Sequence, residues 1–175
     1  PAGSGKSTQA QMLVDSDGYA WRSMGQLFRE TTDPEVHDLM RRGELVSFEK
    51  TNQVLSEALN KFDTSAKLIL DGYPRDIKQA KWLIEYCKMQ NILIDSALNF
   101  NVNVEELLQR MELRGRADDT QESINKRLKI YHQEIDPILE CLAQNNTKVI
   151  YIDGIGTVED IHSRVKKALA ECKLA

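Results

Sequence analysis

Cysteine and histidine are scarce in this sequence, and neither forms a metal-binding pattern. The chain of 175 residues has 3 cysteines, Cys87, Cys141 and Cys172, and none of them stands in a CxxC pair. Widely spaced cysteines in odd number are typical of an intracellular protein with reduced thiols rather than of a disulfide-rich secreted domain. The 3 histidines are scattered as well. Neither residue type therefore supplies a recognisable set of zinc ligands.

Two further absences narrow the functional class. No apolar run approaches the roughly 20 residues that a membrane-spanning helix needs, so we expect no membrane partner. Basic residues are not in excess, since 23 Lys and Arg face 27 Asp and Glu for a net charge of -4. That balance argues against a nucleic-acid partner. The length and the 41% of hydrophobic residues suit one globular domain over 1–175.

Short β-like runs alternate with helical patterns along the chain. The apolar runs cover 66–71, 92–102 and 147–153, with a weaker candidate at 19–22. Helical patterns follow Gly5 and cover roughly 34–42, 47–62, 76–90, 103–113, 120–145 and 157–172, with Asp76, Asn103, Thr120 and Thr157 as expected N-caps. This alternation predicts an α/β fold with a mainly parallel sheet.

The segment PAGSGKST (1–8) has the composition of a phosphate-binding loop. Its glycines let the backbone curl so that N–H groups point at phosphate oxygens, and the following helix adds its positive N-terminal end. Lys6 offers a mobile cation for the outer phosphates, and Ser7 or Thr8 offers a hydroxyl for phosphate or Mg²⁺. A Gly/Ser-rich surface loop is the alternative interpretation, but it leaves the position of the lysine unexplained.

A buried run ends in a carboxylate within AKLILDGYPRD (66–76). Open α/β sheets bind ligands at the carboxyl ends of their strands, where Asp71 stands, and its carboxylate could hold Mg²⁺ largely through water. Gly72 and Pro74 predict a rigid turn that projects Arg75. An ordinary Asp-Gly turn after a strand would contain the same residues, so this segment alone leaves both interpretations open.

Arginines cluster in RMELRGRADD (110–119) and recur at Arg127. Arg110 and Arg114 are four residues apart and share one helix face, and Arg116 follows shortly after. Arginine suits phosphate because its planar guanidinium binds in a bidentate manner and keeps its charge. A solvated charged face is the alternative interpretation of this cluster.

Taken in order, these segments resemble the adenylate kinase family. PAGSGKSTQA is followed by SMGQLFR, MRRGELV, DGYPRDIKQA, RGRADD with ESINKRL, and IDGIGTVEDI, which together span nearly the whole chain. The resemblance implies the P-loop nucleoside monophosphate kinase fold, a doubly wound parallel sheet with a monophosphate-binding lid at about 23–52 and a minimal ATP lid at about 113–120. It also implies a cytoplasmic monomer that uses ATP and Mg²⁺. Because the short lid lacks cysteines, no structural zinc is expected.

The resemblance further implies a role for each matching residue. The ATP-binding residues would be Gly3, Ser4, Gly5, Lys6, Ser7, Thr8, Arg110 and Arg114, with Arg110 lying on the ATP base. The acceptor would be bound by Met24, Arg29, Met40, Gly43, Leu45, Val46, Gly72, Arg75, Gln79, Arg116 and Arg127, with Gln79 reading adenine. The catalytic residues would be Lys6, Arg75, Arg114, Arg116 and Arg127, and the Mg²⁺ ligands Ser7 and Asp71, partly through water. Spacing alone would place Arg29 at the surface.

In the family, the strand before the phosphate loop lies in the middle of the sheet. The sequence begins at Pro1, inside that loop, so we expect the first strand to be missing from this chain. Its expected neighbours are the runs 66–71 and 147–153, whose unpaired backbone groups would cost about 1–3 kcal/mol each. The chain as given is therefore expected to be a truncated record of a longer protein and not a competent enzyme by itself.

The leading functional prediction is reversible transfer of a phosphoryl group from ATP-Mg to AMP, giving two ADP. The acceptor is an ionised phosphate oxygen, so positioning and charge neutralisation carry the reaction. A UMP/CMP kinase is the near alternative, because Met24 stands where the family has Thr and a thioether cannot donate a hydrogen bond. A non-catalytic nucleotide-binding homologue is a further alternative. The retained arginines argue against it, because buried arginines without a ligand are costly.

Overall fold

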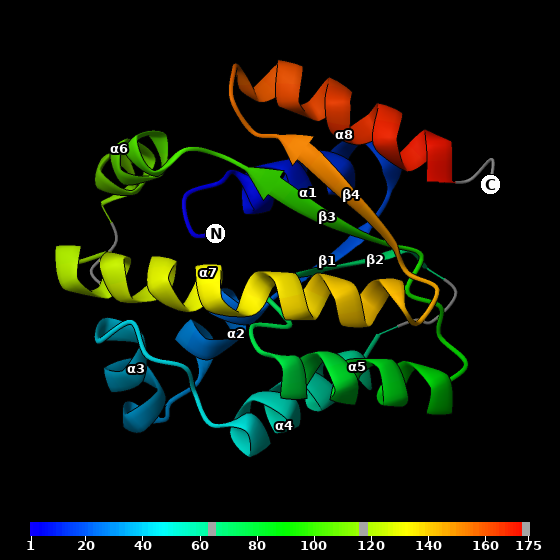
Figure 1. Cartoon of the computed structure of the whole chain (residues 1–175). Coiled ribbons are helices and arrows are strands. Elements are labelled where there is room, and N and C mark those ends of the chain that lie inside the picture. The colour runs from blue at the N-terminus through cyan, green and yellow to red at the C-terminus, as the bar shows by residue number, and fades with distance from the viewer. Residues whose placement is uncertain (63–65, 116–118, 173–175) are drawn as a thin grey trace.

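The computed structural model describes residues 1–62, 66–115 and 119–172, in which strands and helices alternate as the sequence predicts (Figure 1). The elements are α1 (Lys6–Asp17), β1 (Ala20–Ser23), α2 (Met24–Glu30), α3 (Pro34–Arg41), α4 (Phe48–Leu59), β2 (Leu68–Asp71), α5 (Ile77–Met89), β3 (Ser96–Asn101), α6 (Val104–Arg114), α7 (Gln121–Ala143), β4 (Lys148–Asp153) and α8 (Val158–Cys172). The weak strand candidate at 19–22 is confirmed, and the run at 92–102 forms a strand only from Ser96.

The strands form two parallel pairs. β1 pairs with β2 in a register that places Ser23 opposite Asp71. β3 pairs with β4, with Asn101 opposite Asp153. The carboxyl end of each pair therefore carries an acidic residue, and Asp71 lies at the edge where α/β sheets bind ligands. The predicted α/β fold with parallel strands is confirmed.

Helices cover both faces of the strands (Figure 1). On one face, Leu13 of α1 and Val165 of α8 pack with Phe100 of β3 and Ile152 of β4. On the other, α5 and α7 share a cluster that includes Ala80 and three further buried side chains, Ile84, Ile138 and Leu142. The helices on both faces leave most strand residues partly or fully buried.

A large cavity separates the two strand pairs. Its volume is about 1600 Å³, and its lining includes residues 68–71 of β2 and 96–100 of β3. No residue of β4 is among the described lining residues, because β4 lies on the far side of β3. The expectation that the run at 147–153 would border this space was therefore wrong, and the run that contains β3 takes that place.

The predicted helix N-caps are confirmed by hydrogen bonds. The side chains of Asp76, Asn103, Thr120 and Thr157 each accept a hydrogen bond from a backbone N–H three residues further on. Each cap pairs a donor that the helix itself leaves unbonded, which is typically worth about 1 kcal/mol. Among the described helices, none combines the length and apolar character that a membrane-spanning segment requires.

Candidate functional site

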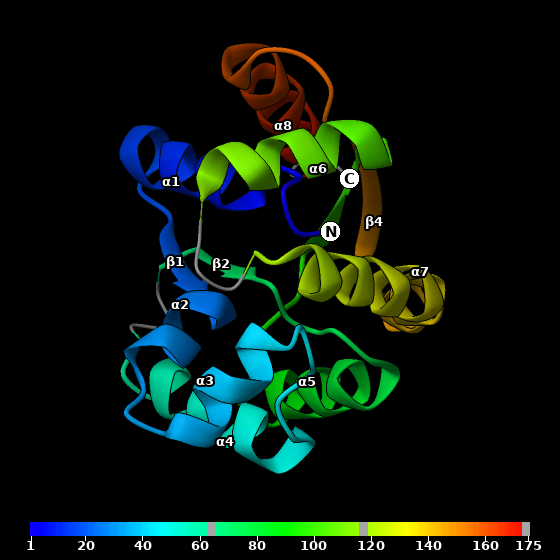
Figure 2. The same cartoon turned by 90° about the vertical axis from the view of Figure 1, so that its left-hand side faces the viewer.

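The cavity beside the phosphate loop gathers predicted site residues that lie far apart along the chain. The lining includes Gly3, Ser4, Gly5, Lys6, Ser7, Thr8, Met24, Arg29, Met40, Gly43, Leu45, Val46, Asp71, Gly72, Arg75, Gln79, Arg110 and Arg127. Arg116 lies outside the described residues, and so does the side chain of Arg114, whose backbone ends α6. Figure 2 shows the phosphate loop between α6 on one side and the helices α3 and α4 on the other.

The phosphate loop requires glycine at two positions. Gly5, the N-cap of α1, has φ +87°, and Gly3 has φ +78°, a region that L side chains rarely adopt. A Cβ at Gly3 would also lie 2.9 Å from the Leu107 carbonyl oxygen. The Lys6 ammonium donates hydrogen bonds to the Pro1 carbonyl and to the hydroxyl of the buried Ser4, 3.2 Å away. The loop thus wraps around its own lysine at the N-terminal end of α1.

A hydroxyl and a carboxylate meet between the phosphate loop and β2. The Ser7 hydroxyl donates a hydrogen bond to an Asp71 carboxylate oxygen at 2.6 Å, and Asp71 is 7% exposed. Two hard oxygen ligands at one point suit Mg²⁺, which usually takes one or two protein oxygens and completes its shell with phosphates and water. In residues 1–62, 66–115 and 119–172, no group of three or more His, Cys, Asp or Glu side chains could hold a metal by itself.

The turn after β2 is held by its own side chains. The Arg75 guanidinium donates to the Gly72 carbonyl at 2.9 Å, and the Arg75 backbone N–H donates to the Gln79 side-chain oxygen at 2.8 Å. The Gln79 backbone N–H in turn donates to Asp76 at 2.8 Å. Gln79 is 2% exposed, so its amide has a fixed position at the start of α5. The geometry brings an arginine and an amide to one corner of the cavity.

A buried polar pair beneath that corner was not predicted. The Tyr73 hydroxyl lies 2.6 Å from the Asn52 side-chain oxygen and 3.3 Å from the Gln79 carbonyl oxygen. Burial raises the pKa of Tyr73, so its hydroxyl keeps its proton as a hydrogen-bond donor. Asn52 stands on α4 in a helical pattern that reads as a solvated face, so no local signal distinguishes it. The pair fixes α4 against the turn that carries Arg75.

The N-terminal part of α7 contacts the end of α3 and the segment that follows it. Arg127 donates to the Met40 carbonyl at 3.0 Å and forms an ion pair with Asp119 at 3.0 Å. The Lys126 ammonium lies 2.6 Å from the Glu44 carboxylate, and this hydrogen bond holds the pKa of Glu44 below its usual range. The contacts of Lys126 with Glu44 and of Arg127 with Met40 join residues more than 80 positions apart. Sequence reasoning identified Arg127 but not the pairing of Lys126 with Glu44.

The segment 24–35 combines a buried residue with a charged network. Met24 is 1% exposed and belongs to the same core cluster as Tyr73. The Arg29 guanidinium folds back along α2, where a Cβ at Gly25 would lie 3.4 Å from it. Further on, Lys50 of α4 forms ion pairs with Asp33 at 2.6 Å and Glu35 at 2.9 Å. Because these side chains are partly exposed, the ion pairs fix the position of α3 more than they stabilise the fold.

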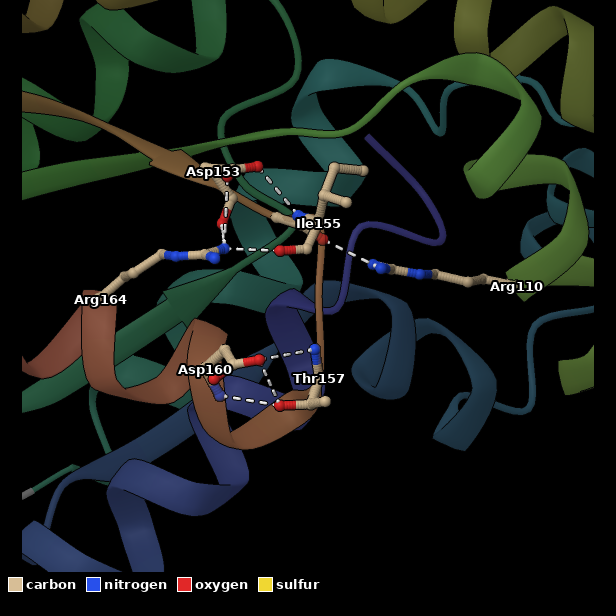
Figure 3. A network of polar contacts seen from close by, with 7 residues as sticks. Arg110, Asp153, Ile155, Thr157, Asp160 and Arg164 are labelled. Carbon is tan, nitrogen blue, oxygen red and sulfur yellow. Dashed lines mark hydrogen bonds and ion pairs between the residues drawn. The ribbon is translucent and has the colours of Figure 1, made fainter.

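Arg110 of α6 also lines the cavity. Its guanidinium donates to Glu106 at 2.7 Å and to the Gly154 carbonyl at 3.0 Å, as Figure 3 shows for the second contact. A Cβ at Gly5 would lie 3.9 Å from the same guanidinium, so Arg110 stands beside the phosphate loop. Through the bond to Gly154, the loop 153–157 contacts a residue of the cavity lining, and only its place in the motif IDGIGTVEDI pointed to it in the sequence.

Comparison with known proteins agrees with this geometry. A family model described as adenylate kinase matches residues 1–147. An adenylate kinase of Mycobacterium ulcerans (strain Agy99) is 41% identical over 98% of this chain and 96% of its own length. An adenylate kinase of Mycobacteroides abscessus is 39% identical over 97% of the chain and 95% of its own length. An adenylate kinase of Mycobacterium tuberculosis (strain ATCC 25618 / H37Rv) is 37% identical over 98% of this chain and 96% of its own length.

Proposed function

Because this chain belongs to the adenylate kinase family, we propose that its cavity holds ATP and AMP together and transfers the terminal phosphoryl group of ATP to AMP. The observation that carries the proposal is the hydrogen bond between Ser7 and Asp71, which joins the phosphate loop to the carboxyl end of β2. Lys6 and Arg75 line the same cavity. Cations and hydroxyls in this arrangement suit a reaction that depends on charge neutralisation rather than on a base.

The proposed roles follow from the positions in the cavity. Residues 1–8 bind the ATP phosphates, and Arg110 beside this loop supports the ATP base. Arg29, Arg75 and Arg127 neutralise the phosphates, and Ser7 with Asp71 holds Mg²⁺, partly through water. When bound, Mg²⁺ adds positive charge beside the phosphates. Arg114 and Arg116 are proposed to act on the phosphates from the ATP lid at 113–120.

The acceptor is proposed to lie against the segment 23–52. Met24, Met40, Gly43, Leu45 and Val46 supply the apolar wall from this segment, and all of them line the cavity. Gly72 and Gln79 border it from the turn after β2 and from α5. The ion pairs that Lys50 and Lys126 form hold the segment in place as a lid. From the family we further propose a cytoplasmic monomer without structural zinc.

Gln79→Ala is expected to weaken discrimination between AMP and CMP by roughly 1–3 kcal/mol, because complementary polar groups of the adenine edge lose their partner. The measurement is the ratio of kcat/KM for AMP to that for CMP. Gln144→Ala, at the exposed end of α7, is the matched control and should leave the ratio unchanged. An unaltered ratio in Gln79→Ala would remove this residue from base recognition. Met24→Thr tests the same pocket from the other side and should sharpen the preference for AMP.

The proposed reaction is tested by its stoichiometry and its metal dependence. With ATP, AMP and Mg²⁺, the intact protein should form two ADP for each ATP consumed. Chelation of the metal with EDTA should abolish turnover, and added Mg²⁺ should restore it. Release of inorganic phosphate from ATP without phosphorylation of AMP would contradict the proposal, and so would full turnover in EDTA.

A further inference from the structure

The loop 153–157 is fixed from the side that faces away from the cavity by one arginine. Arg164 of α8 donates to the Asp153 carbonyl at 2.8 Å and to the Ile155 carbonyl at 2.6 Å. The same guanidinium forms an ion pair with the Asp153 carboxylate at 3.4 Å. Figure 3 shows Arg164 and Arg110 reaching this loop from opposite sides. The carbonyls on either side of Gly154 are thus oriented toward α8 by a single charge, while the Gly154 carbonyl accepts from Arg110.

Further contacts within the loop complete its shape. The Ile155 backbone N–H donates to the Asp153 carboxylate at 3.0 Å. The Thr157 hydroxyl donates to Asp160 at 2.8 Å and accepts from the Asp160 backbone N–H at 3.1 Å, which caps α8. Gly156 has φ +119°, and a Cβ there would lie 3.6 Å from the Arg164 guanidinium. A loop bonded at so many points has little freedom to adapt to a ligand by itself.

The loop also contacts Arg110, the lining residue that we assign to the base of ATP. The Gly154 carbonyl accepts from Arg110, and Arg110 stands beside Gly5 of the phosphate loop. A base resting on the Arg110 guanidinium therefore has the backbone of residues 154–156 as its neighbour. A displacement of this loop would change the surface under the base, while the phosphate loop stays anchored by its own hydrogen bonds from Lys6 to Pro1 and Ser4.

We propose that Arg164 is a positioning residue that holds the loop 153–157 against Arg110 and thereby sets the affinity for the base of the phosphoryl donor. The proposal rests on the function proposed above, because it takes the end of the cavity at Arg110 as the donor's base site. Arg164 does not contact the donor, so its effect passes through the loop. It strengthens binding of ATP and leaves binding of a donor without a base unaffected.

The experiment compares two ligands by titration calorimetry in the intact protein. ATP carries a base, whereas inorganic tripolyphosphate carries the three phosphates alone. In Arg164→Gln, the Kd of ATP should rise roughly 10-fold, because two carbonyls lose a charged hydrogen-bond donor. The Kd of tripolyphosphate should stay within about twofold of the wild-type value, since the substitution removes no contact of the phosphate loop. Arg164→Lys keeps the charge and should restore part of the ATP affinity.

The matched control is Lys167→Gln, which removes an exposed charge from the same helix and should leave both constants unchanged. Equal weakening of ATP and tripolyphosphate would overturn the proposal, because the change would then act on the whole fold or on the phosphates. An unchanged ATP affinity in Arg164→Gln would overturn it too. A wild-type protein that binds ATP yet forms no ADP from ATP and AMP would contradict the proposed reaction, while this comparison would still decide the role of Arg164.

Discussion

Lys6→Ala and Arg75→Ala are each expected to lower kcat by roughly 100-fold or more. Each change removes a positive charge that we place beside the phosphoryl group in transit, and such charges act in a site that excludes water. The Lys6 ammonium stands within the phosphate loop, bonded to Ser4. The Arg75 guanidinium projects from the turn after β2, bonded to Gly72. Initial rates of ADP formation at saturating ATP and AMP measure both effects.

Two controls separate a catalytic effect from a loss of fold. Lys81→Ala removes an exposed lysine from α5, and Arg41→Ala removes an exposed arginine from α3 that forms an ion pair with Asp38. Both should retain turnover close to that of the wild type. Thermal unfolding of all four variants should agree within a few degrees. Near-native turnover in either Lys6→Ala or Arg75→Ala would contradict the proposed chemistry.

Gly43→Ala is expected to separate the segment 23–52, against which we place AMP, from α7. We call this segment the acceptor segment. Gly43 has φ +67°, and a Cβ there would lie 2.5 Å from the Ser123 carbonyl oxygen and 2.8 Å from the Ser123 Cα. Both atoms belong to the backbone of α7, so the segment itself must move. Such overpacking typically costs 1–3 kcal/mol, and the left-handed conformation adds about 1–2 kcal/mol. The hydrogen bond from Arg127 to Met40 would be lost with the contact.

The expected results are a lower melting temperature and a KM for AMP raised by roughly 10-fold, equivalent to about 1.4 kcal/mol of binding free energy. Gly18→Ala is the matched control. Gly18 has φ +68° and no atom within 4 Å of an added Cβ, so it carries the conformational strain without the collision. It should lose only about 1–2 kcal/mol of stability and keep its KM for AMP. Equal losses in both variants would show that the contact with Ser123 does not position the acceptor segment.

The local features of the fold could be predicted from the sequence because they depend on near neighbours along the chain. Asp76, Asn103 and Thr120 cap their helices through bonds that span three residues, a spacing that the sequence displays directly. The apolar runs predicted the strands for a similar reason. The first helical residue of α1 follows from the phosphate loop, whose glycines and lysine stand in a fixed order.

The missed features depend on which elements become neighbours in space. The pairs Lys126–Glu44 and Tyr73–Asn52 each join a helix residue to a residue of a distant turn or loop, without a local sequence signal for either. The strand that borders the cavity opposite β2 was assigned incorrectly for the same reason. We expected the run at 147–153, but β3 takes that place. Periodicity predicts strands but not their order in a sheet. Arg164 reads as a surface charge in the sequence, and only the path of the loop 153–157 brings two carbonyls within its reach.

The central claim, that this protein phosphorylates AMP from ATP, is tested most directly by comparing acceptors. The measurement is kcat/KM for AMP, CMP, UMP, GMP and dTMP with saturating ATP and Mg²⁺, followed by coupled detection of ADP. We predict that AMP gives the highest value, because Gln79 presents both a donor and an acceptor to the adenine edge. A higher value for CMP or UMP would contradict the assignment of the acceptor, and phosphorylation of none of the five would contradict the proposed reaction itself.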